Sequence, residues 1–411
     1  MVFPPASRLS ALPNYLFAEL DEKKQRARAA GKDLVDLGVG DPDLPTPPHI
    51  VAALRKALLR PDSYGYPPYE GTEEFRQAVA EWYRKHKGVN LDPKSEVIAL
   101  IGSKEGIGHA PLALLDPGDS ALLPDPGYPV YSNSVILAGA RPIPMPVTEE
   151  REFLPDFAAI PSSVSASGEA RAKLMFLNYP GNPTAAVAYP GFYKEAVEFA
   201  RERGVAVLHD HAYGEVTFDG YAAPSFLSAP GAMEAGIEFH SLSKTYCMTG
   251  WRIGFAAGNA EILKHLLKFK TQVDSGAFKA LQSAGAAALT GPQAAVKKMR
   301  EIFQKRRDLF LDGLRAAGLR APKPKATFYV WARVPAGETS ASFASRLLEG
   351  PGIVATPGNG FGIPLPEGRG EEHRQVRPAG EGYVRFSLTQ PTPRIREAVK
   401  RLERLKVSGG R

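Results

Sequence analysis

Short apolar runs alternate with amphipathic stretches over most of the chain. Four runs have the length of a strand, are largely apolar and lead into polar or turn residues: residues 97–101, 121–123, 173–177 and 205–208. Such runs, separated by helical patterns, are typical of buried strands in a largely parallel sheet that helices cover. Residues 192–203 have helical spacing, and Gly204 is placed to end that helix. The pattern predicts an α/β protein whose ligand-binding residues follow the strands.

The last third of the chain has a different pattern. Residues 293–317 have the spacing of one long amphipathic helix, and residues 327–331 and 383–388 alternate as half-exposed strands do. A long helix with short alternating strands predicts a smaller α+β lobe, which we expect the N-terminal residues to complete. Residues 365–382 are rich in Gly, Glu and Arg and predict an exposed loop.

These patterns divide the chain into three parts. We expect residues 1–40 to form an N-terminal arm and part of the small domain, and residues 41–285 to form a large domain. Residues 286–411 are expected to form the C-terminal small domain.

Composition and charge exclude several classes of protein. The chain has 411 residues and a formal net charge of +7, with acids and bases mixed along it, so no nucleic-acid partner is expected. Cys247 is the only cysteine, which excludes an internal disulfide and a cysteine-based zinc site, and no metal is expected. No apolar run approaches the roughly 18 residues of a membrane helix, and Met1–Pro5 lacks the pattern of a signal peptide. We therefore expect a cytoplasmic protein without a membrane partner.

The segment from Ser241 to Arg252 contains the most informative chemistry. Ser241 and Ser243 are alternate hydroxyls, Lys244 lies beside the second, and Arg252 follows eight residues later. Hydroxyls and a guanidinium suit a phosphate dianion, and a lysine can form a Schiff base with a carbonyl. Together these groups match the needs of pyridoxal 5′-phosphate (PLP), although a basic surface loop could have the same residues.

This segment resembles the lysine motif of class I aminotransferases, which are PLP-dependent enzymes of fold type I. The resemblance implies a large domain with a mostly parallel mixed sheet and a smaller α+β domain. It implies that Lys244 bonds the cofactor covalently, and that Ser241, Ser243 and Arg252 hold its phosphate. The likeness extends from about residue 10 to residue 400.

A second segment places an acid after a buried strand. Asp210 follows the apolar residues 205–208, and Tyr213 lies three residues further on. A carboxylate at the end of an apolar strand is costly unless it is paired, and its alternative role is a helix N-cap. The resemblance implies that Asp210 pairs with the pyridine nitrogen and that Tyr213 donates to the ring's 3-oxygen. Lys244, Asp210 and Tyr213 are thus the expected catalytic residues.

Three more segments follow predicted strands and add candidate binding residues. From the residues alone, Asn182 belongs to a Pro/Asn turn, Ser103 and Lys104 to a Gly-rich helix start, and Tyr128 to a core position. The resemblance implies that Asn182 contacts both the 3-oxygen and the substrate carboxylate. It implies that Ser103 and Lys104 complete the phosphate site, that Lys104 reaches the substrate, and that Tyr128 packs on the ring and lines the substrate site.

Two further positions concern the substrate and the assembly. Arg385 lies in the alternating strand 383–388, where a surface salt bridge is the simpler interpretation. The resemblance implies that Arg385 binds the substrate α-carboxylate. It also implies that Tyr66 contacts the phosphate of a neighbouring subunit, so that a homodimer shares its active sites.

Four segments narrow the resemblance to a subgroup, the LL-diaminopimelate aminotransferases: residues 36–47, 103–107, 218–221 and 236–241. Within this subgroup Tyr15 and Gly40 would line the substrate pocket. The resemblance implies ping-pong transfer of an amino group between an amino acid and a 2-oxo acid. The expected pair is LL-diaminopimelate with 2-oxoglutarate or glutamate, in lysine biosynthesis.

Three alternatives remain open at this stage. The first is an aminotransferase for aspartate, alanine, aromatic or several amino acids. The second is a PLP-dependent lyase or synthase on the same fold. The third is a non-catalytic regulator, which would need an added DNA-binding module for which the segment before Tyr15 leaves no room.

Overall fold

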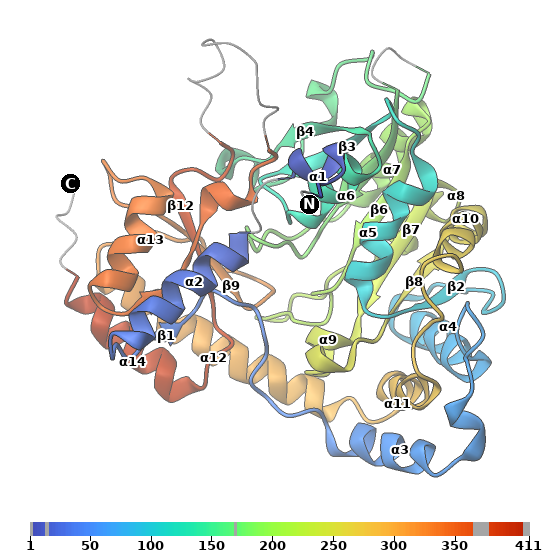
Figure 1. Cartoon of the computed structure of the whole chain (residues 1–411), viewed down its shortest axis with the longest axis horizontal. Coiled ribbons are helices and arrows are strands. Elements are labelled where there is room, and N and C mark those ends of the chain that lie inside the picture. Colours follow the sequence, from blue (N-terminus) through green and yellow to red (C-terminus); the bar gives the residue numbers. More distant parts are fainter. Residues whose placement is uncertain (1–2, 13–15, 168–170, 365–377, 406–411) are drawn as a thin grey trace.

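The largest sheet has seven strands in the order β2-β8-β7-β6-β5-β3-β4 (Figure 1). Its strands are β2 (Val97–Leu100), β3 (Ser120–Asp125), β4 (Arg141–Pro146), β5 (Ala172–Leu177), β6 (Ala206–Asp210), β7 (Gly236–Ser241) and β8 (Gly254–Gly258). All neighbours are parallel except β8, which runs antiparallel to both β2 and β7. The expected α/β fold with a mostly parallel mixed sheet is therefore confirmed.

The computed structural model describes residues 3–12, 16–167, 171–364 and 378–405, and for residues 16–20 it describes the backbone alone. The predicted loop 365–382 therefore lies largely outside the described residues, as does Tyr15. Within the described part of the chain, no helix is both long and apolar enough to cross a lipid bilayer.

Alternate residues of the buried strands pack against two layers of helices. On one face, Leu174 and Phe176 belong to a core cluster with residues of α5 (Ser103–Leu114), α6 (Val130–Leu137) and α10 (Ala260–Lys270). On the other face, Met175 and Leu177 join a cluster with α4 (Glu73–Lys87), α7 (Phe192–Arg203) and α11 (Lys279–Thr290). Helices on both faces explain why these strands are apolar throughout. The predicted helix 192–203 is α7, and Gly204 ends it at φ +67°.

The structure describes five other helices in the first 290 residues: α1 (Ser7–Ser10), α2 (Leu16–Ala29), α3 (Pro48–Leu58), α8 (Ala232–Ala235) and α9 (Leu242–Thr245). Six 3₁₀ turns are described: Pro61–Tyr64, Glu149–Arg151, Phe157–Ala159, Phe226–Ser228, Thr249–Trp251 and Gly358–Phe361. The element α9 matters most for the site, because it follows β7 directly and carries Lys244.

A smaller lobe lies beside the large sheet, reached through the long helix α12 (Ala294–Ala316) (Figure 1). It contains β9 (Tyr329–Arg333), β11 (Thr356–Pro357) and β12 (Tyr383–Ser387), paired antiparallel in the order β11-β12-β9. The N-terminal strand β1 (Val35–Asp36) pairs in parallel with β10 (Ile353–Val354). The helices α13 (Ser340–Glu349) and α14 (Thr392–Glu403) complete the lobe.

The strands β9 and β12 are more buried than their alternating sequence predicts. Four of the five residues in each are buried. Val330 and Val384 pack on Phe310 of α12 and other apolar residues of the small lobe, whereas Tyr329 and Trp331 join the core of the large lobe. The prediction of half-exposed strands was wrong because the large lobe covers the face that solvent was expected to cover.

Candidate active site

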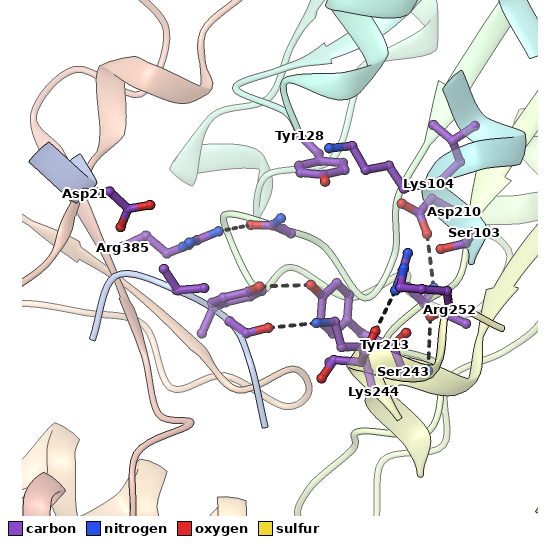
Figure 2. Close-up of a pocket in the computed structure, with 18 residues that line it drawn as sticks. Asp21, Ser103, Lys104, Tyr128, Asp210, Tyr213, Ser243, Lys244, Arg252 and Arg385 are labelled. Carbon is purple, nitrogen blue, oxygen red and sulfur yellow. Dashed lines mark hydrogen bonds between the residues drawn. The ribbon is translucent and has the colours of Figure 1, made fainter. Parts of the chain in front are cut away.

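A cavity of about 390 Å³ lies where the carboxyl ends of β5, β6 and β7 meet the small lobe (Figure 2). Every site residue predicted from the sequence lines it except two: Gly40, Ser103, Lys104, Tyr128, Asn182, Asp210, Tyr213, Ser241, Ser243, Lys244, Arg252 and Arg385 are all lining residues. The exceptions are Tyr15, which lies outside the described residues, and Tyr66, which is 84% exposed. The structure thus brings together groups that are separated by more than 300 positions in the chain.

One end of the cavity is built to receive an anion. Ser241 ends β7, and its Oγ accepts a hydrogen bond from the amide of Ser243 (3.2 Å), which fixes the turn into α9. Arg252 donates to the carbonyl of Thr249 (2.7 Å). A Cβ on Gly102, at φ +93°, would lie 2.3 Å from Arg252 Nη2, so only glycine allows the guanidinium to approach the start of α5. Hydroxyls, a guanidinium and the amides of that helix start suit a phosphate.

Lys244 is the buried amine at the centre of the cavity. Its Nζ donates to the carbonyl of Gly40 (2.7 Å), which comes from the N-terminal part of the chain. The pKa of Lys244 is lowered to about 8, chiefly by burial and also by the positive charges of Arg252 and Arg385, while the negative charge of Asp41 opposes the shift. The ordinary pKa of a lysine amine is near 10.4. The lowered pKa therefore leaves a much larger fraction of Lys244 uncharged at neutral pH than of an exposed lysine. Neutral amine is the form that attacks a carbonyl or accepts a proton.

Asp210 is a buried carboxylate on another wall of the same cavity. Its Oδ2 accepts from the hydroxyl of Tyr131 (2.8 Å), and its Oδ1 accepts from the amide of Ala212 (3.1 Å). The ring of Tyr131 stacks on Phe176 with 5.0 Å between centroids, which fixes the hydroxyl in place. Burial raises the pKa of Asp210, whereas the two hydrogen bonds lower it. A cationic ring nitrogen would compensate the buried charge.

The small lobe supplies the buried guanidinium of Arg385, which lines the cavity (Figure 2). Arg385 is 1% exposed, and it donates to Asn182 Oδ1 (2.6 Å) and to the carbonyl of Gly38 (2.7 Å). Its guanidinium also lies 4.2 Å from the ring centroid of Tyr329. The alternative of a surface salt bridge is therefore wrong, because a buried fork of this kind is suited to a carboxylate ligand.

Sequence reasoning missed several side chains at or beside the cavity, and three of them bear on its chemistry. Tyr329 and Asp21 line it, and Tyr131 reaches it through Asp210. Tyr131 lies three residues after Tyr128, a spacing that could have indicated a shared face. Tyr329 and Asp21 gave no local signal, because tertiary packing alone brings β9 and α2 to this place.

The donor set fits PLP. The anion-binding end matches its phosphate, the buried amine of Lys244 matches its aldehyde, and the carboxylate of Asp210 matches its protonated ring nitrogen. Tyr128 and Ser103 also line this cavity. The fold and this donor set together define a PLP-dependent enzyme of fold type I.

The chain belongs to the class I and II aminotransferase family, whose model matches residues 32–402. It is 52% identical over 400 residues to the LL-diaminopimelate aminotransferase of Moorella thermoacetica, covering 97% of this chain and 98% of the relative. It is 51% identical over 402 residues to the LL-diaminopimelate aminotransferase of Desulforudis audaxviator, covering 98% of each. Among solved structures, substrate-bound BacF of Bacillus subtilis matches with a TM-score of 0.90 and 39% identity over the whole of both chains. The chain is thus a PLP-dependent transaminase.

We predict that Tyr131→Phe weakens the site without unfolding it. The substitution keeps the ring that stacks on Phe176 and removes the hydroxyl that stabilises the Asp210 carboxylate. A hydrogen bond to a charged group contributes about 1.5–3 kcal/mol, so kcat/KM should fall about 10- to 100-fold, and PLP should bind more weakly. Steady-state kinetics and PLP titration measure the two effects.

Tyr193→Phe is the matched control for this prediction. Tyr193 is also buried and hydrogen-bonded, to His209 and to the carbonyl of Tyr179, but it does not line the cavity. An equal loss of activity in both variants, or an unchanged kcat/KM in Tyr131→Phe, would contradict the role given to Tyr131.

Proposed function

We propose that this transaminase moves an amino group between LL-diaminopimelate and 2-oxoglutarate, with glutamate as the other amino acid of the pair, in lysine biosynthesis. The observation that carries the proposal is the similarity over nearly the full length to several relatives at about 50% identity, each named LL-diaminopimelate aminotransferase. The charges of the cavity support it. The residues alone left aspartate, alanine and aromatic donors open, and these are tested below.

Diaminopimelate has two amino-carboxylate ends, so its enzyme must accept a second ammonium far from the reacting carbon. Among the described lining residues, the acids are Asp210 and Asp21. Asp210 is buried at the cofactor wall, whereas the side chain of Asp21 is 54% exposed at the mouth, on α2. We therefore assign Asp21, which also pairs with Lys24 of the same helix, to the distal ammonium, because an acid there favours a cationic group over a second carboxylate.

Substrate binding is assigned to groups on both lobes. Arg385 and Asn182 hold the α-carboxylate, since they face the cavity and are already joined by a hydrogen bond. Lys104 lies at the other side of the same cavity and adds positive charge near the substrate. With Gly40 and Tyr128 these groups surround the donor and exclude water from its reacting end.

When bound, PLP supplies an aldehyde carbon that accepts the amino group and a ring that takes up the electron pair left at the donor Cα. Lys244 Nζ is the base that takes the Cα proton, and its lowered pKa keeps a neutral fraction available for this. The carboxylate of Asp210 would hold the proton on the ring nitrogen, and the hydroxyl of Tyr213 and the amide of Asn182 are assigned to the 3-oxygen. Ser103, Ser241, Ser243 and Arg252 anchor the phosphate.

We also propose that two chains share their active sites. Tyr66 does not line the cavity of its own chain and is exposed, as are Leu59, Tyr64, Tyr69, Val273 and Phe278, and we infer that these side chains form one apolar patch. The two segments of the patch are joined where Lys279 donates to the carbonyl of Asp62 (2.9 Å). An apolar patch of this kind marks an interface, and a second copy covering it would carry Tyr66 to the neighbour's phosphate site.

Cys247 is a thiol outside any disulfide, which suits the reducing cytoplasm that we propose for this homodimer.

A panel of amino donors with 2-oxoglutarate tests the proposed function. We predict the highest kcat/KM for LL-diaminopimelate, above those for aspartate, alanine and phenylalanine, with glutamate as the product in each case. Higher kcat/KM for one of the other donors, with none for diaminopimelate, would contradict the substrate assignment. Continuous product release from the amino acid alone, without a 2-oxo acid, would instead indicate a lyase.

The variant Asp21→Asn tests the distal site. We predict that KM for LL-diaminopimelate rises about 3- to 10-fold, as expected for loss of one partly exposed ion pair of ~1 kcal/mol. KM for glutamate should not rise, because glutamate has no second ammonium. Glu22→Gln is the control, since Glu22 lies beside Asp21 on α2 but pairs with Arg26 away from the cavity. Equal changes for both donors would exclude a distal role for Asp21.

A further inference from the structure

Tyr329 is a buried tyrosine that joins the two lobes inside the cavity. It begins β9, where it pairs with Ser387 of β12, two residues from Arg385. Residues two apart on a strand share a face, so Tyr329 and Arg385 lie diagonally on the face that looks into the cavity. The tyrosine is 3% exposed, and its hydroxyl lies 2.9 Å from the hydroxyl of Tyr213 on the large lobe.

The hydroxyl of Tyr329 is held in a narrow place. A Cβ on Gly40 would lie 2.1 Å from it, so the glycine is what lets the hydroxyl approach Tyr213. The carbonyl of that same glycine accepts from Lys244 Nζ. The guanidinium of Arg385 lies over the ring of Tyr329, 4.2 Å from the ring centroid. The position of the hydroxyl is therefore fixed by contacts from both lobes.

The direction of the bond between the two hydroxyls follows from counting protons. A tyrosine hydroxyl has one proton to donate. If Tyr213 gives that proton to the 3-oxygen of the cofactor, as the proposed function assigns, it must accept from Tyr329. An oxygen that accepts a hydrogen bond becomes a stronger donor in its own bond. The cation over the ring of Tyr329 strengthens the first donor of this chain.

We propose that Tyr329 is a positioning residue that sets the strength of the Tyr213 hydrogen bond to the cofactor and links it to Arg385. This proposal rests on the proposed function, because it needs Tyr213 to act on the 3-oxygen. Arg385, which binds the substrate carboxylate, thereby acts through Tyr329 on the group that controls the basicity of the cofactor. Tyr329 itself transfers no proton to or from the substrate.

Other charged groups also bear on the hydroxyl of Tyr213, and each remains in place when Tyr329 is changed. They are Arg385 on β12 and Asp210 on β6, with Lys244 on α9 lining the same cavity. A phenylalanine at position 329 keeps the ring beneath Arg385 and removes only the hydroxyl. The variant Tyr329→Phe therefore isolates the proposed hydrogen bond.

The test is a pH titration of the visible absorption of bound PLP in the intact holoenzyme. With a weaker donor at Tyr213, the 3-oxygen is less stabilised as an anion and keeps its proton to higher pH. Tyr329→Phe should therefore raise the midpoint by about half a pH unit, which is a threefold change in the acid dissociation constant. Tyr213→Phe should raise it further, and adding Tyr329→Phe to Tyr213→Phe should change nothing more.

Tyr383→Phe is the control for loss of a tyrosine hydroxyl from the small lobe. Tyr383 lies on β12 and donates to Glu149 Oε2 (2.7 Å), outside the cavity, so its midpoint should equal that of the unmodified enzyme. An unchanged midpoint in Tyr329→Phe, beside a raised one in Tyr213→Phe, would overturn the proposal and leave the proposed function standing. A full shift from Tyr329→Phe in the Tyr213→Phe background would also overturn it. An unchanged midpoint in Tyr213→Phe would overturn the assignment of Tyr213 and this proposal together.

Discussion

The site is organised around one hydrogen bond, from Lys244 Nζ to the carbonyl of Gly40. It joins the short helix after β7 to the N-terminal part of the chain, and it holds a buried amine at the centre of the cavity. Burial makes this amine less basic, and a buried amine needs partners if the fold is to tolerate it. Gly40 is also the residue against which Tyr329 packs, so the position of the amine and the approach of the small lobe are set at the same place.

The electrostatics of the cavity explain why an anionic cofactor and an anionic substrate suit it. Among the described lining residues the cations are Lys104, Lys244, Arg252 and Arg385, and the acids are Asp21 and Asp210. The two acids lie at opposite ends of the cavity: Asp210 on the wall expected to hold the cofactor, and Asp21 at the mouth. A positive interior with an acid at each end matches a ligand with a phosphate, a carboxylate and separate cationic groups. The same arrangement motivates the choice of a diamino donor over a simple dicarboxylic one.

Much of the site could be predicted from the sequence because it is local. Ser241, Ser243, Lys244 and Arg252 lie within one strand, turn and short helix, so their spacing in the chain is close to their arrangement in space. Asp210 and Asn182 could be found because they follow parallel strands, whose carboxyl ends meet at one edge. Tyr329 and Asp21 could not be found from the sequence, because only the packing of the small lobe and of α2 brings them to the cavity. The same docking buries β9 and β12, whose alternating sequence predicts solvent on one face. The alternation there separates a face that packs within the small lobe from a face that packs against the large lobe.

The most direct test of the account is to find which lysine bonds the cofactor. The protein is loaded with PLP, reduced with borohydride to fix the bond, digested and mapped by mass spectrometry. The account predicts a pyridoxyl group on the peptide that contains Lys244, where burial has lowered the pKa of the amine. Lys104 is the other lysine that lines the cavity among the described residues. A pyridoxyl group on Lys104, or on a surface lysine with Lys244 unmodified, would contradict the account.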